Sequence, residues 1–81
     1  MPRYKIVEGP EYRVLRENTV HKRQIDAIRG QEFNSIEGII KNLSEPLHIR
    51  EEDKLNLDLL SRIPICYDYA PDYQVAIIEV L

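Results

Sequence analysis

The residues best suited to binding gather in one short segment near the C-terminus. Three tyrosines and two aspartates stand within seven residues of one another: Tyr67, Asp68, Tyr69, Asp72 and Tyr73. Tyrosine is favoured at protein interfaces because it buries a large rigid ring and keeps a polar tip. The two carboxylates suit such a surface to a basic partner. The pattern therefore predicts a partner-binding surface, although β propensity and sheet packing explain the tyrosines equally well.

A second candidate site is the basic stretch of residues 12–29. Four cationic side chains there are placed to contact phosphates, with an aromatic neighbour to stack on a base: Arg13, Arg16, Lys22 and Arg23. The chain as a whole is acidic, with a formal net charge of -3 and a pI of about 5.3, whereas nucleic-acid-binding domains are usually strongly basic. A nucleic-acid-binding module is thus the alternative function, and a solvated polar loop is the simpler interpretation.

Catalytic patterns are sparse. The three glycines are too scattered to form a phosphate-binding loop. Cys66 can be paired on paper with His21 or His48 as nucleophile and base, but its apolar neighbours favour a small buried hydrophobe. His48 also precedes the acidic run 51–53, for which a solvated helix start is a simpler explanation than a metal site. We therefore expect no enzyme activity, no cofactor and no metal site.

Length and composition indicate one small domain spanning residues 1–81. A chain of 81 residues, 43% of them hydrophobic, forms a small core with a thin stability margin. No apolar run approaches the roughly 20 residues that span a bilayer, and no signal peptide is visible. The single cysteine fits a reducing compartment. We expect a cytoplasmic protein with no membrane partner.

Charge is distributed unevenly along the chain. Residues 1–30 carry seven basic and four acidic side chains, whereas residues 31–81 carry four basic and ten acidic ones. Such polarity marks either an interaction surface or head-to-tail self-association, unless the two halves fold together and their charges interleave. With a small core, this polarity leads us to expect a homodimer, because an interface adds burial that the monomer lacks.

Two hairpins are predicted, one at each end of the chain. Residues 4–7 and 12–15 have the composition of short strands, and Gly9-Pro10 between them is a strong turn signal. Residues 65–69 and 73–81 form the second pair, joined by a turn at residues 70–72. The segment 73–81 is apolar on both faces, which predicts a central strand.

Helices are expected between the hairpins. Residues 19–30 favour a helix capped by Thr19, with a third strand or an ordered loop as alternatives. In residues 34–44, Asn34 and Glu37 have the spacing of a capping box before a helical apolar face.

Residues 50–63 are the last helix candidate. An acidic first turn and a stripe of spaced leucines, including Leu55 and Leu59, predict a buried helical face that ends at Pro64. Residues 55–59 also alternate with period two, as a strand does.

The predicted elements describe an α+β fold. It has a small antiparallel sheet, made of the N-terminal and C-terminal hairpins, with two or three helices packed on one face. On this scaffold we expect a non-catalytic protein-binding module that acts as an accessory subunit, or as a regulator or inhibitor, of a larger protein.

Overall fold

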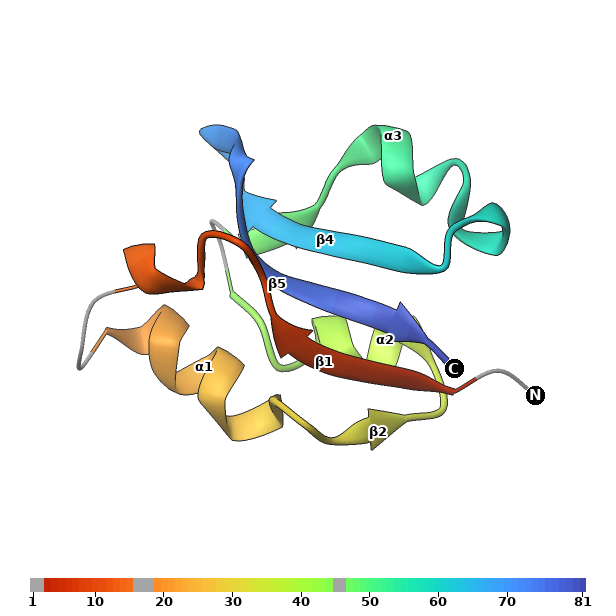
Figure 1. Cartoon of the computed structure of the whole chain (residues 1–81), viewed down its shortest axis with the longest axis horizontal. Helices are drawn as coiled ribbons and strands as arrows, with labels where there is room; N and C mark the ends of the chain where they lie inside the picture. The colour runs from red at the N-terminus through yellow and green to blue at the C-terminus, as the bar shows by residue number, and fades with distance from the viewer. Residues whose placement is uncertain (1–2, 16–18, 45–46) are drawn as a thin grey trace.

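The sheet is five-stranded and antiparallel throughout. The computed structural model describes residues 3–15, 19–44 and 47–81, and in these the strand order is β2-β1-β5-β4-β3 (Figure 1). The strands are β1 Tyr4–Glu8, β2 Glu32–Phe33, β3 Leu47–Ile49, β4 Arg62–Tyr67 and β5 Ala70–Val80. Mixed α and β content and an antiparallel sheet are therefore confirmed.

The central strand is β5. It pairs with β1 along one edge and with β4 along the other. Residues 75–78 are each no more than 4% exposed, because both faces of this strand are covered. The central position predicted for residues 73–81 is confirmed.

The predicted N-terminal hairpin is wrong. After β1 the chain stays on β5: the Gly9 amide donates to the Val75 carbonyl at 3.2 Å and the Glu11 amide to the Gln74 carbonyl at 2.9 Å. A Cβ at Gly9 would lie 2.2 Å from the Gln74 carbonyl oxygen, so only glycine permits this approach. The chain then forms the short 3₁₀-helix η1 (Tyr12–Val14), where the second strand was expected.

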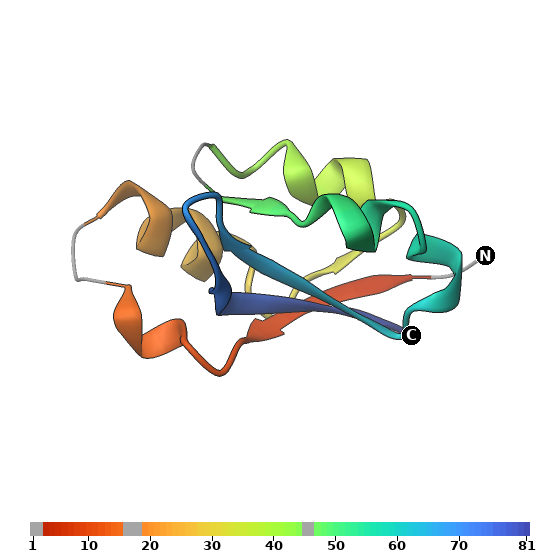
Figure 2. The same cartoon turned by 90° about the horizontal axis from the view of Figure 1, so that it is seen from above.

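One helix of more than two turns is present in the described chain. This is α1 (Val20–Ile28), and Thr19 caps it by accepting a hydrogen bond from the Lys22 amide at 3.3 Å, as predicted. The helices α2 (Ile36–Ile40) and α3 (Glu51–Lys54) have five and four residues. In Figure 2, α1 and α2 lie on the same side of the sheet. The expectation of two or three helices packed on one face is thus only partly confirmed.

The cap of α2 lies one residue later than predicted. Ser35 is the N-cap, and its hydroxyl accepts from the Gly38 amide at 3.1 Å. Asn34 does not fill that role. A hydroxyl and an amide side chain are similar caps, so the spacing to Glu37 alone does not decide between adjacent candidates.

The predicted long helix over residues 50–63 is also wrong. Here α3 ends at Lys54, a 3₁₀-helix η2 (Leu57–Leu59) follows, and β4 begins at Arg62. Pro64 lies inside β4, opposite Ile77 of β5 and one residue beyond the end of the register with β3. A proline fits there because β3 no longer requires a hydrogen bond from that position.

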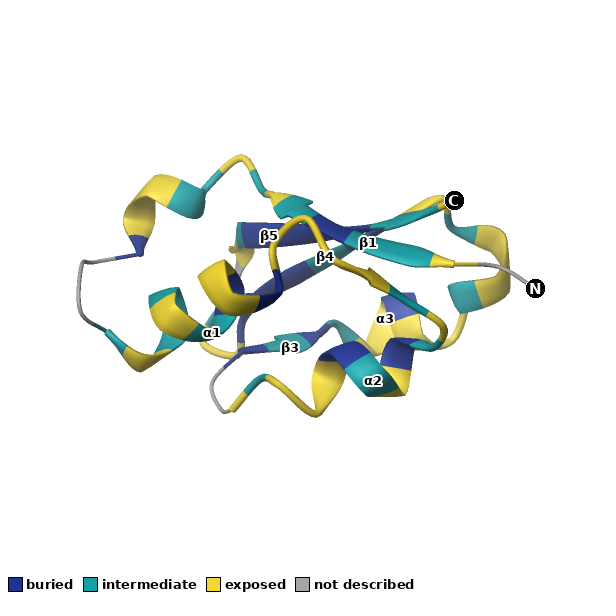
Figure 3. Ribbon diagram, turned by 90° about the horizontal axis from the view of Figure 1, so that it is seen from below, coloured by how far each residue is buried: buried dark blue, intermediate teal, exposed yellow. Residues whose placement is uncertain are grey.

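The main core lies between the sheet and the helices α1 and α2. Figure 3 shows buried positions on the strands and on the helix faces turned toward them. Both helices contribute isoleucines and the strands contribute further apolar side chains, among them Ile6, Ile25, Ile39, Ile65 and Ile78, all 0% exposed. Within the described residues, no helix has the length and apolar character needed to cross a membrane.

Candidate functional site

Three separate segments meet at the end of the molecule that lies opposite the two termini. These are η1, the start of α1 and the turn between β4 and β5, all at the left of Figures 1 and 2. Together they line a shallow cavity of about 240 Å³. We call its six lining residues the tyrosine pocket: Val14, Thr19, His21, Tyr67, Tyr69 and Tyr73.

The β4–β5 turn brings the three predicted tyrosines together. The turn predicted at residues 70–72 is wrong: β4 ends at Tyr67 and β5 begins at Ala70, so only two residues connect them. Ala70 pairs with Tyr67 and Gln74 pairs with Cys66, so β5 has three extra residues between two positions that are adjacent in β4. Extra residues of this kind bend a strand and re-aim its side chains, which accounts for Tyr73 facing the same cavity as Tyr67.

The buried ring of Tyr67 forms the floor of the tyrosine pocket, and the exposed rings of Tyr69 and Tyr73 form its rim. Tyr67 is 8% exposed, and its ring stacks on Tyr69 with 5.3 Å between centroids and 22° between planes. His21 meets Tyr67 edge to face at 5.8 Å. Tyr69 and Tyr73 are 75% and 46% exposed, so their rings are accessible to a partner. Burial raises the pKa of Tyr67 above its ordinary value.

The two aspartates are exposed next to these rings. Asp68 lies in the turn between Tyr67 and Tyr69, and Asp72 immediately precedes Tyr73. The Oδ1 atom of Asp68 is 3.5 Å from Nε2 of His48, an ion-pair contact when the imidazole is protonated but too long for a normal hydrogen bond. Neither aspartate is among the residues that line the tyrosine pocket, but both add negative charge at the positions that precede the two rim tyrosines.

A polar network holds η1 against α1. The Tyr12 hydroxyl donates to Asp26, and the Lys22 ammonium donates to Asp26 at 2.8 Å and to the Tyr12 oxygen at 3.1 Å. Hydrogen bonds from Lys22 and Tyr12 lower the pKa of Asp26, and the same contacts raise the pKa of Lys22. The cations of Lys22 and Arg29 both lie over the Tyr12 ring, at 5.1 and 5.2 Å from its centroid. This network fixes η1, and with it the pocket residue Val14.

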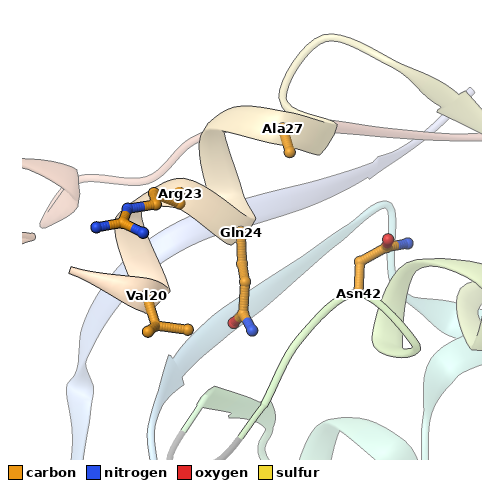
Figure 4. A pocket seen from close by; sticks show the side chains of 5 residues that line it. All are labelled: Val20, Arg23, Gln24, Ala27 and Asn42. Atoms are coloured by element: carbon orange, nitrogen blue, oxygen red, sulfur yellow. The ribbon is translucent and has the colours of Figure 1, made fainter. Parts of the chain in front are cut away.

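Three of the four cationic residues of the alternative site lie among the described residues, and none of the three lines the tyrosine pocket. Lys22 and Tyr12 are engaged with each other and with Asp26, and Arg13 is exposed on η1. Arg23 lines a different cavity of about 270 Å³, beside Val20, Gln24, Ala27 and Asn42 (Figure 4). Arg16 lies outside the described residues.

The second cavity is a gap between α1 and the segment after α2. Figure 4 shows Gln24 extending from α1 across this gap, while Arg23 projects to the side. The Gln24 amide is already paired, since it donates to the Ser44 hydroxyl at 3.0 Å and accepts from the Ser44 amide at 3.2 Å. The Gln24 side chain that crosses this gap therefore serves to join α1 to the segment after α2, although the gap is slightly larger than the tyrosine pocket.

The pairing of Cys66 and His48 lacks the geometry of a nucleophile and its base. The two residues are cross-strand neighbours, but the Cys66 thiol is buried and donates to the His48 carbonyl at 3.8 Å. The His48 ring contacts the Ile49 carbonyl oxygen instead, at 2.9 Å from Nδ1. Burial raises the pKa of Cys66, which disfavours the reactive thiolate. Across residues 3–15, 19–44 and 47–81, no three His, Cys, Asp or Glu side chains converge to hold a metal ion.

Half of the tyrosine pocket was missed by sequence reasoning. Val14, Thr19 and His21 come from segments distant along the chain, and the sequence gives no direct sign that they meet the tyrosines. The cap at Thr19 was the one available signal, because it places His21 in the first turn of α1. No family model, curated protein or solved structure matches the chain, so the site is argued from its own geometry.

Proposed function

We propose that this chain is a small, non-catalytic protein-binding module, an accessory subunit or a regulator or inhibitor of a larger protein. In this proposal it engages a basic segment of its partner at the tyrosine pocket. The observation that carries it is the exposure of Tyr69 and Tyr73, at 75% and 46%, beside a cavity whose floor is Tyr67. Aromatic rings held in water around a concave surface are typical of binding sites.

The size of the tyrosine pocket favours a side chain as its occupant. Small-molecule and cofactor sites usually measure about 300–1,000 Å³ and bury most of the ligand. This cavity is about 240 Å³ and open to solvent. One or two side chains of a partner fit such a volume better than a cofactor does.

Charge favours a basic partner over an acidic one. The exposed carboxylates of Asp68 and Asp72 belong to the residues that directly precede the rim tyrosines. Complementary charge steers association and suppresses like-charged partners.

Backbone amide NMR of the labelled protein tests this proposal with three synthetic peptides of equal length, one basic, one acidic and one neutral. The basic peptide is expected to give saturable shifts at His21, Tyr67, Tyr69 and Tyr73. Tyr73→Ala should weaken its binding about tenfold, since truncated aromatic anchors are the largest contributors to interfaces. The control Leu59→Ala removes an apolar side chain that is even more exposed, outside the pocket, and should leave binding unchanged.

Two results of this experiment would contradict the proposal. One is an absence of shifts at the pocket with the basic peptide. The other is obtained when a short single-stranded oligonucleotide is added: amide shifts at Arg13 and Arg23, with none at the tyrosines, would support the nucleic-acid alternative instead.

The expected homodimer and the expected cytoplasmic location remain parts of this proposal. Cys66 is buried and forms no disulfide, which is consistent with a reducing compartment. Light scattering at high concentration tests the dimer: twice the mass of 9.6 kDa supports it, and the monomer mass contradicts it.

A further inference from the structure

We infer that the tyrosine pocket is selective for arginine and takes a guanidinium group of the partner in preference to a lysine ammonium. This inference rests on the proposed function and specifies the side chain that enters the cavity. Its basis is the combination of accessible ring faces and an apolar wall at one small cavity, with exposed carboxylates on the residues that precede the two rim tyrosines.

The rings present flat faces of the kind on which a guanidinium stacks. Because Tyr67 is buried, stacked on Tyr69 and in T-shaped contact with His21, the accessible ring surfaces belong to Tyr69 and Tyr73. A planar, weakly hydrated guanidinium stacks on such surfaces, whereas an ammonium is compact and strongly hydrated. The accessible rings therefore favour arginine over lysine.

The stem and the charge of an arginine also find partners at this cavity. Val14 is half exposed and lines the cavity, so it offers an apolar contact for the methylene groups. Asp68 and Asp72 do not line the cavity, but they are exposed and directly precede Tyr69 and Tyr73, so they add negative charge near its rim. The chain itself shows the same chemistry elsewhere, where Arg29 lies over the Tyr12 ring and also pairs with Asp26 and Glu8.

Three peptides that differ in one central residue test the inference directly. The residue is arginine, lysine or citrulline, the last being the neutral analogue of arginine. Affinities are measured from amide shifts at the pocket residues of the full chain. The arginine peptide is expected to bind about threefold to tenfold more tightly than the lysine peptide, and the citrulline peptide more weakly than either.

Variants separate stacking from charge. Tyr73→Leu keeps apolar bulk but removes a ring, and should reduce the preference for arginine over lysine to about twofold or less. Asp68→Asn combined with Asp72→Asn should weaken both cationic peptides by a similar factor of about twofold to fivefold, because these charges are exposed. Leu59→Ala serves as the control with unchanged affinities.

The outcomes distinguish this inference from the proposed function. Equal binding of the arginine and lysine peptides at the pocket overturns arginine selectivity and leaves a basic docking site intact. Equal binding of arginine and citrulline also overturns it, since charge would then play no part. No pocket shift with either cationic peptide overturns both the inference and the proposed function.

Discussion

Two regions of this protein expose apolar side chains, and they differ in how those side chains are held. The tyrosine pocket lies at one end, where η1, α1 and the β4–β5 turn converge on a cavity. The leucine segment, residues 55–59, lies between α3 and β4 and exposes Leu55 and Leu59 at 85% and 83%. Exposure is higher in the leucine segment, where Leu57 and Asp58 line a cavity of about 230 Å³ with Tyr4 and residues 34–37. The two most exposed leucines are not among the residues that line this cavity, whereas the exposed rings of Tyr69 and Tyr73 both line the tyrosine pocket.

The contrast teaches that convergence, and not exposure, identifies a site. In the tyrosine pocket the rim ring of Tyr69 stacks on the buried floor ring of Tyr67, and the Tyr12 network fixes η1 on the opposite wall. In the leucine segment the neighbouring ion pair of Lys54 with Glu51 is exposed and contributes little. Single apolar side chains on a surface are common and need no functional explanation.

Removal of the pocket floor should have the largest effect on stability. Tyr67→Ala deletes a buried ring that packs on both Tyr69 and His21, and we expect a loss of about 3–4 kcal/mol in the free energy of unfolding. Tyr69→Ala should change it by less than about 0.5 kcal/mol, because that ring is mostly in water. Urea denaturation compares the two. Equal losses would contradict the division into floor and rim.

A methyl group at Gly9 should disrupt the pocket wall that η1 supplies. The added Cβ would collide with backbone atoms of β5, so Gly9→Ala should cost about 2–3 kcal/mol or more. Gly30→Ala is the matched control: Gly30 has φ of +83° and open space around its Cβ position, so only about 1 kcal/mol is expected. A smaller loss at Gly9 than at Gly30 would mean that η1 does not depend on this close approach.

Acid should weaken the contact between η1 and α1. Since the pKa of Asp26 is lowered in the fold, its contribution is present above its ordinary pKa of 3.8 and is lost as pH falls through the folded value. Asp26→Asn removes that contribution, which we expect to be about 1 kcal/mol or less because the carboxylate is partly exposed. Denaturation of both forms between neutral and acid pH should show a difference that shrinks toward low pH. A difference independent of pH would exclude the charge of Asp26 as the cause.

The smallest effect is expected in the leucine segment. Leu55→Ser or Leu59→Ser should alter the stability of the monomer by less than about 0.5 kcal/mol, because neither side chain is packed. Chemical denaturation of the dilute protein measures the free energy of unfolding of each variant. A loss above about 2 kcal/mol would show that the segment is buried in solution, for instance in a dimer.

The sequence predicted those elements whose signals are local. The strand at residues 73–81 follows from apolar residues on both of its faces, and the start of α1 follows from Thr19. Residues 12–15 have strand-like composition, but residues 12–14 form η1 because the close approach of Gly9 to β5 directs the chain there. No local sequence pattern indicates such a contact. Tertiary contacts of this kind override propensity.

The helix predicted for the leucine segment was wrong for a related reason. Its spaced leucines fit a helical face, yet a helix there would have to continue through residues that β4 needs for pairing with β5. The sheet pairing prevails, so Leu55 and Leu59 remain in solvent, while Leu57 packs partly against the core. The tyrosine grouping was foreseeable because the residues are close in sequence, whereas Val14 and His21 join them only through the fold.

The most direct test of the docking site is a calorimetric titration with the arginine peptide against two double variants. One carries Tyr69→Ala and Tyr73→Ala in the tyrosine pocket, and the other carries Leu55→Ala and Leu59→Ala in the leucine segment. We predict that the first loses at least about tenfold in affinity while the second binds as the parent protein does. Equal affinities for both variants, or a loss confined to the leucine variant, would contradict the account.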